Sequence, residues 1–492
     1  MQRGSGILLH LSSLPSPYGI GTMGKEAYAF VDFLEKAGQK YWQILPLGPT
    51  SYGDSPYQSF STFAGNPYFI DFDLLCEDGA LKPEDYRSLD WGDTADAVDY
   101  GRIFALRFDV LKRAWEHDRL LLQKEVADFR TKNSYWIENY AMYMALKFDS
   151  HQHSYQEWDN DIKCRKPEAM TEAFARLEDE IHFWVYVQYR FFEQWNKLKT
   201  YANQKGIQII GDIPIYVAED SADAWAHNEI LQLDENRTPL RVAGCPPDYF
   251  AVKGQLWGNP LYDWESLKNH RYEWWIARMR AALTMYDIVR IDHFRGFSAF
   301  YSIPYGREDA VVGEWVPGPG MDFFRTLCEE LGDGLAVIAE DLGMMDDGVR
   351  NLLRDTGFPG MKVAQFGFTP GQNSEYLPHN YPRNTVAYIG THDNNTLLGW
   401  FNEESSAVQE FTCAYMRTTP KELHWGFVET MMGSVADTVI FMAQDLLGLG
   451  KSARMNTPST LGGNWIWRLE SLDSLDDKLA NRLKKLTEVY SR

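Results

Sequence analysis

Acidic side chains at the ends of short apolar runs are the residues of this sequence best placed to do chemistry. Asp292, Glu340 and Asp393 each lie at or just after the end of such a run, and Asp212 lies near the end of another. A single aspartate in such a place is more often a helix cap or an ion-pair partner. Several carboxyl groups that meet at one rim, however, are what the cleavage of a glycosidic bond requires.

The neighbours of the first two acids predict different roles for them. Arg290 lies two residues before Asp292, so both side chains would point to the same side of a strand. A guanidinium beside a carboxyl favours its ionised form, and an ionised Asp292 could attack an anomeric carbon as a nucleophile. A second carboxylate nearby would instead keep a proton on Glu340, which could then act as the general acid.

The distance between these two carboxyl groups would decide the stereochemistry. Groups about 5–5.5 Å apart support a retaining mechanism through a covalent glycosyl–enzyme intermediate. Asp393 would be the third member, binding sugar hydroxyls and stabilising a transition state that resembles an oxocarbenium ion. His293 and His392 lie beside the first and the last acid. A histidine alone is more often a structural, hydrogen-bonded residue, but the combination is more specific than any one member.

Eight short, β-rich apolar runs would position these acids, and most of those from the third onward are separated by stretches long enough for a helix. Near-continuous apolar runs with helices between them favour a parallel sheet that is covered on both faces. Eight such units predict an α/β fold of the closed (β/α)8 TIM-barrel type, in which active residues follow the carboxyl ends of strands. A doubly wound open sheet is the alternative, but no Gly-x-Gly-x-x-Gly turn follows the first run. The runs cover residues 6–11, 41–47, 206–215, 287–292, 335–340, 361–366, 385–391 and 437–444.

The gap between the second and third runs is about 160 residues long, and much of it has the pattern of amphipathic helix. We therefore expect residues 1–72 to hold the first two barrel strands, residues 73–205 to form a largely helical inserted subdomain, and residues 206–492 to complete the barrel. Residues 216–275, with many Gly, Pro, Asp and Trp, would be a loop-rich, lid-like insertion after the third strand. About 48 residues follow the last run, which leaves no room for a C-terminal β-sandwich.

The composition disfavours several classes of function. The 492-residue chain has a net charge of −21, and so acidic a surface repels nucleic-acid phosphates and anionic lipids. No apolar run approaches the roughly 18 residues of a membrane span, and the N-terminal residues lack the pattern of a signal peptide. The five cysteines are scattered and form no ligand-like cluster, which favours reduced thiols and a cytoplasmic location. We therefore expect no nucleic-acid or membrane partner, and the oligomeric state is left open.

Aromatic residues make up 14% of the chain and include 17 tryptophans, which bears on the kind of ligand. Aromatic faces stack on the C–H patches of sugar rings, although most of these side chains are expected to fill cores. Residues 244–262 carry several aromatic side chains and are a candidate lid that would exclude water and bind an acceptor sugar. This segment weakly favours transfer to a sugar over hydrolysis.

Four segments around the acids resemble sequence regions of the α-amylase clan. They are residues 290–297 (RIDHFRGF), 339–343 (AEDLG), 391–394 (THDN) and 211–215 (GDIPI), placed on strands in that clan's order. Further segments are similar to a narrower family, the amylomaltases, which are 4-α-glucanotransferases of glycoside hydrolase family 77. Together they span nearly the whole chain and comprise residues 5–10, 13–21, 42–49, 54–67, 244–250, 254–262 and 456–460.

The resemblance implies roles that agree with those expected from the residues, with Asp292 as nucleophile, Glu340 as acid/base and Asp393 as transition-state stabiliser. It also implies a set of sugar-binding positions, which are Ser55, Tyr57, Asp212, Asp248, Arg290, His293, Asp341, His392 and Asn464. Four residues on the long loop after the third strand would flank the cleft, namely Tyr249, Phe250, Gln255 and Trp257. For the three aromatic members of that group, packing against the barrel rim is the alternative.

Some positions depart from the family pattern. Residues 10–12 read His-Leu-Ser where His-Pro-Thr is expected, and Cys245 stands where a small apolar residue is more usual. The segment that begins at Asp212 lacks the asparagine and histidine that many α-amylases carry there, and that asparagine helps to bind calcium. We therefore expect neither a metal nor another cofactor.

The resemblance predicts a 4-α-glucanotransferase that moves a segment of α-1,4-glucan to the 4-hydroxyl group of another glucan or of glucose. Maltooligosaccharides and amylose are the expected substrates, and glycogen and starch are left open. A hydrolase with the same acids and a carbohydrate-binding protein with an inactive site are the other hypotheses, and the three intact acids disfavour the second of these. Tyr52 and Tyr100 are candidates for a second, remote glucan site.

Overall fold

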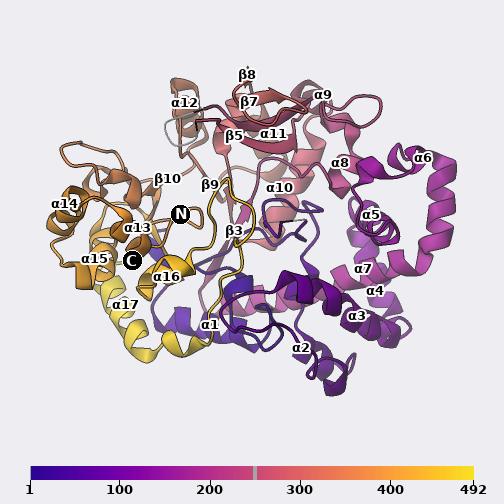
Figure 1. The fold of residues 1–492 in the computed structure, drawn as a ribbon, viewed down its shortest axis with the longest axis horizontal. Coiled ribbons are helices and arrows are strands. Elements are labelled where there is room, and N and C mark those ends of the chain that lie inside the picture. Colours follow the sequence, from indigo (N-terminus) through magenta and orange to yellow (C-terminus); the bar gives the residue numbers. More distant parts are fainter. Residues whose placement is uncertain (1, 52, 248–251) are drawn as a thin grey trace.

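The computed structural model describes residues 2–51, 53–247 and 252–492 (Figure 1). Its centre is a sheet of eight parallel strands in the order β10-β11-β12-β1-β2-β3-β6-β9. Each strand overlaps one of the eight predicted runs. The strands are β1 (Gly4–Leu8), β2 (Tyr41–Gln43), β3 (Gln208–Ile213), β6 (Ile288–Ile291), β9 (Val337–Ala339), β10 (Gly360–Val363), β11 (Thr385–Tyr388) and β12 (Thr438–Met442).

The two outermost strands of this sheet, β9 and β10, meet and close it into a barrel. The Ala339 N–H donates a hydrogen bond of 3.0 Å to the Pro359 carbonyl. Beside it, the Asp341 carboxylate accepts a hydrogen bond of 2.5 Å from the Met361 N–H. The predicted (β/α)8 barrel is therefore confirmed, and the alternative of an open, doubly wound sheet is wrong.

The barrel interior holds an apolar plug with a polar layer at its carboxyl-terminal end. Because side chains alternate along a strand, every second residue faces the interior. Residues from all eight strands form one buried apolar cluster, which comprises Leu8, Tyr41, Ile210, Ile288, Ile338, Met361, Val363, Val386, Tyr388, Ile440 and Met442. Gln43, Asp212 and Arg290 lie two residues beyond members of that cluster and are also buried. The same alternation that fills the barrel thus places polar groups at its mouth.

A layer of helices surrounds the barrel and covers outward-facing strand residues such as Ile7, Trp42 and Val289. The helices are α1 (Lys25–Lys36), α10 (Glu273–Met285), α11 (Gly320–Leu331), α12 (Asp347–Thr356), α13 (Leu397–Glu403), α14 (Ser406–Met416), α15 (Leu423–Gly433), α16 (Ala443–Leu446) and α17 (Asp477–Tyr490). The last of them, α17, packs against α1 and α15 and brings the C-terminus next to β1. Within the described ranges, no helix combines the length and the apolar character needed to cross a bilayer.

The connection between β2 and β3 is mainly helical, as its amphipathic pattern predicts. Its last helix, α7 (Pro167–Gln204), begins with a proline and bends at Leu177, where the backbone leaves helical geometry. The second half of α7 returns to the barrel, where the Trp195 Nε1–H donates a hydrogen bond of 3.0 Å to the Met285 carbonyl. One helix thus joins the insertion to the barrel, and the boundaries at residues 72 and 205 stay a prediction. The other helices are α2 (Phe72–Glu77), α3 (Tyr100–Asp118), α4 (Gln123–Lys132), α5 (Ile137–Asp149) and α6 (Asn160–Lys163).

A second, antiparallel sheet in the order β5-β4-β7-β8 was not predicted from the sequence. Two of its strands come from the insertion that was expected to be loop-rich, and the other two follow β6. The strands are β4 (Arg241–Cys245), β5 (Gln255–Pro260), β7 (Ala299–Pro304) and β8 (Glu314–Pro317). Gly244 and Pro260 interrupt the alternating pattern of the first two strands, and the pairing of β4 with β7 joins segments far apart in the chain. This sheet carries Gln255 and Trp257 toward the barrel mouth.

Candidate active site

Arg290 is the centre of a buried ion-pair network at the barrel mouth. Its Nη1 donates hydrogen bonds of 2.8 and 2.6 Å to the two carboxylate oxygens of Asp212 on the adjacent strand β3. Its Nη2 donates one of 2.9 Å to Asp292 Oδ1, just beyond the end of β6. The side chains of Arg290 and Asp212 are 5% and 0% exposed, whereas that of Asp292 is 31% exposed. Asp292 is therefore the member of the network that a ligand could reach.

Glu340 lies beside Asp292 because its carboxyl group binds the backbone of the neighbouring strand end. Glu340 Oε2 accepts a hydrogen bond of 2.7 Å from the His293 N–H, and Oε1 accepts one of 2.8 Å from the Leu342 N–H. His293 follows Asp292 directly in the chain and adopts a left-handed backbone conformation, with φ 53°. Its N–H is directed at Glu340. The structure thus brings together the two acids that the sequence predicted on adjacent strands.

The protonation of this pair follows from burial and from the unequal distribution of positive charge. The pKa of Glu340 is raised to about 8, first by burial and then by the nearby charge of Asp292, while Arg290 and the two backbone N–H groups oppose the shift. Burial also raises the pKa of Asp292, although Arg290 opposes that shift. The sequence-based expectation that the guanidinium decides the ionisation of Asp292 therefore overlooked desolvation. Of the two acids Asp292 and Glu340, only Asp292 is hydrogen-bonded to Arg290. The proton that this pair shares therefore belongs on Glu340.

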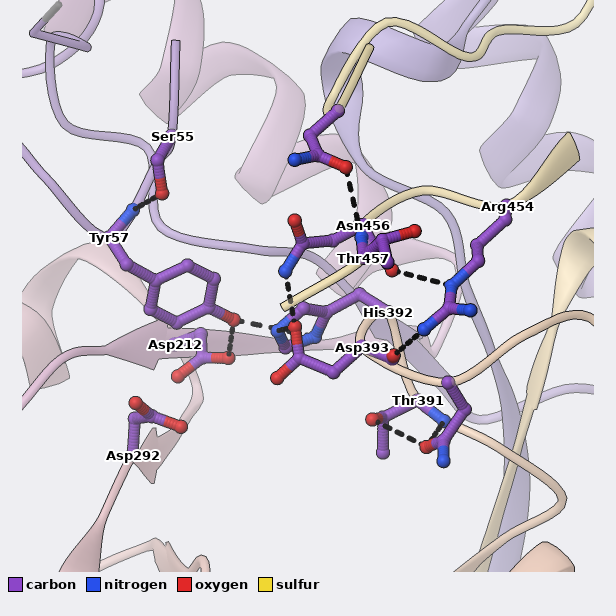
Figure 2. A network of polar contacts seen from close by, with 12 residues as sticks. Ser55, Tyr57, Asp212, Asp292, Thr391, His392, Asp393, Arg454, Asn456 and Thr457 are labelled. Carbon is purple, nitrogen blue, oxygen red and sulfur yellow. Dashed lines mark hydrogen bonds and ion pairs between the residues drawn. The ribbon is translucent and has the colours of Figure 1, made fainter. Parts of the chain in front are cut away.

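An aromatic and polar cluster links three loops around the mouth (Figure 2). The Tyr57 hydroxyl donates a hydrogen bond of 2.8 Å to Asp212 Oδ2, which ties the loop after β2 to β3. The Tyr57 ring stacks on the His392 ring, with centroids 5.0 Å apart and planes at 19°. Trp465 packs against both rings at 5.8 Å. Tyr57 and His392, two predicted sugar-binding residues, are therefore held together and next to Asp212.

Asp393, the third predicted acid, is held by the C-terminal segment of the chain. Its side chain is 49% exposed, in contrast to the buried Arg290 and Asp212. Asp393 Oδ1 accepts a hydrogen bond of 2.6 Å from the side-chain amide of Asn456 (Figure 2). Arg454 donates one of 2.8 Å to the Asp393 carbonyl. Neither Asn456 nor Arg454 was predicted as a site residue. The segment 456–460 indicated only the resemblance to the amylomaltases.

His293, which follows Asp292 in the chain, packs against Trp257 of β5. The Trp257 ring meets the His293 ring edge to face, with centroids 4.7 Å apart and planes at 90°. The Trp257 Nε1–H donates a hydrogen bond of 3.1 Å to Gln255 Oε1, so the predicted Gln255 orients this indole. Burial lowers the pKa of His293 to about 3 and keeps the ring neutral. Its buried Nε2 has no hydrogen-bond partner among the described residues, and such an atom is suited to meet a ligand hydroxyl.

The remaining predicted site residues bind backbone groups around the mouth or lie outside the described residues. Asp341 is buried at the junction of β9 and β10, where its Oδ1 accepts from the Met361 N–H. Ser55 Oγ accepts a hydrogen bond of 3.3 Å from the Tyr57 N–H. Asn464 Oδ1 accepts one of 2.9 Å from the Thr457 N–H and closes a loop beside Asp393. Three predicted residues, Asp248, Tyr249 and Phe250, lie outside the described residues, as does Tyr52.

A cavity of about 700 Å³ adjoins this mouth but is not the candidate active site. It lies between α4, α7 and α10 and reaches Tyr57 and Asp212 at its inner end. Asp292, Glu340 and Asp393 do not line it. Within the part of the chain that the structure describes, no three His, Cys, Asp or Glu side chains are grouped so that they could hold a metal ion. The candidate site is therefore the mouth with Asp292, Glu340 and Asp393, and not this cavity.

An eight-stranded α/β barrel with buried acids and an arginine at one mouth defines a class of carbohydrate-active barrel enzymes. The sequence model of one family within this class, described as 4-alpha-glucanotransferase (glycoside hydrolase family 77), matches residues 9–474. The chain belongs to this family.

Individual relatives are similar in sequence to this chain over its full length. The 4-alpha-glucanotransferase of Clostridium butyricum is 48% identical over 98% of this chain and 100% of its own. That of Thermus thermophilus is 44% identical, with 100% and 99% of the two chains covered. The amylomaltase from Streptococcus agalactiae, solved in complex with acarbose, is 44% identical, covers 100% of both chains and has a TM-score of 0.97. The predicted activity is confirmed: the chain is an enzyme with 4-alpha-glucanotransferase activity.

Proposed function

We propose that the enzyme transfers segments of α-1,4-glucan by a retaining mechanism in which Asp292 is the nucleophile, Glu340 the acid and base, and Asp393 the stabiliser of the transition state. The observation that carries this assignment is the position of Glu340, whose Oε2 accepts from the N–H of the residue that follows Asp292. The Asp292 carboxylate is bound to Arg290, whereas Glu340 is not. Glu340 is instead bound to the N–H that follows Asp292, which brings the two side chains together. They supply an anion and a proton donor side by side.

In the first step, Asp292 attacks the anomeric carbon of a donor glucan. Arg290 occupies Oδ1 of Asp292, so Oδ2 is the attacking oxygen. The bond between the anomeric carbon and the 4-oxygen of the next glucose residue breaks, and the proton of Glu340 passes to that oxygen. The reducing-end part of the donor leaves with a new 4-hydroxyl group, and the remainder is bound to Asp292 as an ester.

In the second step, the 4-hydroxyl group of an acceptor sugar replaces the part that left. The ionised Glu340 takes the proton of that hydroxyl, the oxygen attacks the anomeric carbon, and the ester bond to Asp292 breaks. The two N–H groups of His293 and Leu342 stabilise the Glu340 carboxylate between the steps. Burial and these donors act in opposite directions, and a pKa of about 8 suits a group that must both give and take a proton.

Asp393 supplies negative charge on the other side of the reacting sugar. The transition state resembles an oxocarbenium ion, and a fixed carboxylate close to it lowers its free energy. The partly exposed side chain of Asp393 projects from the loop after β11, next to the stacked rings of His392 and Tyr57. We assign binding of sugar hydroxyl groups to His392 and His293, and stacking against a sugar ring to Trp257, whereas the fully buried Asp212 supports the site through Arg290 and Tyr57.

We propose maltooligosaccharides and amylose as donors, and glucans or glucose as acceptors, with the reaction in the cytoplasm. The acarbose complex of the Streptococcus agalactiae amylomaltase supports an oligosaccharide as the occupant of the equivalent mouth in this chain. The free thiols of Cys76, Cys164, Cys328 and Cys413 fit a reducing compartment. Trp257 lies on β5 beside His293, and we propose that its ring faces an acceptor and excludes water.

The assignment is tested by products and by trapping. Wild-type enzyme incubated with maltotriose should give glucose and a ladder of longer oligomers, whereas maltose and glucose without a ladder would indicate hydrolysis. Asp292→Ala should lose at least about 10⁴-fold in turnover while remaining folded. In Glu340→Gln, a glycosyl fluoride donor needs no acid, so the intermediate should accumulate. Mass spectrometry should then find the sugar on the peptide that contains Asp292, and a sugar on any other residue would contradict the assignment.

A further inference from the structure

The segment that contains Arg454 and Asn456 is bound along the loop that carries Asp393. The Asn456 N–H donates a hydrogen bond of 3.1 Å to the His392 carbonyl. Arg454 donates from Nη2 to the Asp393 carbonyl at 2.8 Å and from Nε to the Asn456 carbonyl at 2.7 Å. Three hydrogen bonds, of which the two from Arg454 are seen in Figure 2, thus fix the backbones of residues 392–393 and 456 relative to each other.

The loop beyond this segment is closed at its base, which gives Asn456 a rigid support. The Thr457 N–H donates a hydrogen bond of 2.9 Å to Asn464 Oδ1, and the Trp465 N–H donates one of 2.7 Å to the Met455 carbonyl. Trp465 also packs against the rings of Tyr57 and His392 at the site. Asn456 is therefore held from both directions along the chain, by Met455 and Arg454 on one side and by the closed loop on the other.

The side chain of Asn456 makes the one hydrogen bond to the Asp393 carboxylate that the described residues form. The distance from Asn456 Nδ2 to Asp393 Oδ1 is 2.6 Å, which is short for a neutral donor. The Asp393 side chain is 49% exposed, so without this bond little would restrict its rotation. His392 Nε2 lies 3.4 Å from the same oxygen, a longer contact to the same side of the carboxylate. Asp393 Oδ2 is left for a ligand.

From this geometry we infer that Asn456 is a positioning residue for Asp393, and that Arg454 fixes the backbone on which both depend. The inference rests on the proposed role of Asp393 as the stabiliser of the transition state. A neutral amide orients the carboxylate without cancelling its charge, which a lysine or arginine at that position would do. The cation that is present, Arg454, binds main-chain carbonyl groups instead. The charge of Asp393 therefore stays available to the reacting sugar.

The first test removes the amide donor. In Asn456→Ala, the kcat for transfer from maltotriose should fall by about 10²-fold, because an acid that stabilises only the transition state loses its alignment. The KM should change by less than about threefold, since binding of the ground state depends on other groups. Asn384→Ala is the matched control, because Asn384 also donates one side-chain hydrogen bond, to the Gly357 carbonyl, at an exposed place. That control should keep wild-type kinetics.

The second test replaces the donor by a second acid of nearly the same shape. In Asn456→Asp, two carboxylates would face each other, and their repulsion raises the pKa at which the pair takes up a shared proton. Below that pKa the protonated Asp at position 456 can donate to Asp393, and above it the bond is lost. The ratio of variant to wild-type kcat should therefore rise as the pH falls from 8 to 5. A residue with a merely structural role would give a ratio that does not depend on pH.

The third test asks whether Asn456 acts through Asp393. With a glycosyl fluoride donor, Asp393→Ala should be slow, and adding Asn456→Ala should slow it by less than about twofold, because the group that Asn456 positions is already gone. A kcat of Asn456→Ala within twofold of the wild type, a pH-independent ratio for Asn456→Asp, or fully additive losses in the double variant would each overturn the inference. If Asp393→Ala itself kept wild-type activity, the proposed role of Asp393 would fail instead.

Discussion

The two sides of the catalytic mouth are built differently. On one side, Asp292 and Glu340 are held by groups of the barrel itself, namely Arg290 on β6 and the N–H groups that follow β6 and β9. On the other side, Asp393 is held by Asn456, which follows the last strand and an irregular stretch of chain. The first arrangement is buried and charged, and the second is partly exposed and uses a neutral amide. The proposed nucleophile and acid are thus held by groups of the barrel, whereas the proposed stabilising acid depends on a loop.

The largest expected difference between the two sides is in stability. Arg290→Met would leave the buried Asp212 and the partly buried Asp292 without their cation, which should lower the free energy of unfolding by about 3–5 kcal/mol. Arg454→Met removes bonds to partly exposed carbonyl groups and should cost about 1 kcal/mol or less. Urea unfolding monitored by circular dichroism would measure both. Equal losses in the two variants would mean that the sides do not differ as described.

A smaller effect is expected in the pH dependence of kcat/KM. It concerns only the side of the mouth with Asp292 and Glu340, which groups of the barrel hold. As the proposed general acid, Glu340 acts in its protonated form, and its pKa is raised to about 8, so kcat/KM for maltotriose should fall about tenfold per pH unit as the pH rises beyond that value. With a glycosyl fluoride donor, which needs no acid, the first step should lose this alkaline limb. A fall at the same pH with both donors would show that another group titrates, and circular dichroism at pH 9 controls for unfolding.

The smallest effect is expected for Tyr57, which touches both sides. Tyr57→Phe keeps the ring on His392 but removes the hydrogen bond to Asp212, whose two oxygens Arg290 still binds. The free energy of unfolding should fall by about 0.5–1.5 kcal/mol and kcat by a few-fold. Tyr201→Phe is a matched control, because Tyr201 donates to Asp32 at an exposed place. A loss of unfolding free energy as large as that of Arg290→Met would mean that Tyr57 stabilises the ion-pair network as much as Arg290 does.

Much of the fold and of the barrel side could be predicted from the sequence. The strands are buried on both faces, so they appear as apolar runs, and the acids lie at or near the ends of those runs. The period of two placed Arg290 beside Asp292 correctly. What the residues alone did not indicate was the cost of burying Asp292, because a charge pair can be recognised in a sequence but its desolvation cannot.

The second sheet and the Asn456 contact were missed for a different reason. β4 pairs with β7, and Asn456 binds Asp393, across stretches of chain that carry no periodic signal linking the partners. Glycine and proline interrupt β4 and β5, and residues 454–465 are irregular. Contacts of this kind depend on where the completed barrel brings the loops together. They become visible only once the tertiary structure is known.

The closure of the barrel beside Glu340 has a consequence for its motions. β9 is three residues long and pairs along its length only with β6, while on its other side one backbone bond and the Asp341 side chain join it to β10. A Cβ at residue 360 would lie 2.7 Å from an Asp341 oxygen, so glycine there allows this side chain to replace part of the missing ladder. A seam held in this way is where a closed sheet opens at least cost. β9, which precedes the proposed proton donor Glu340, is therefore expected to open more readily than strands that are paired along both edges.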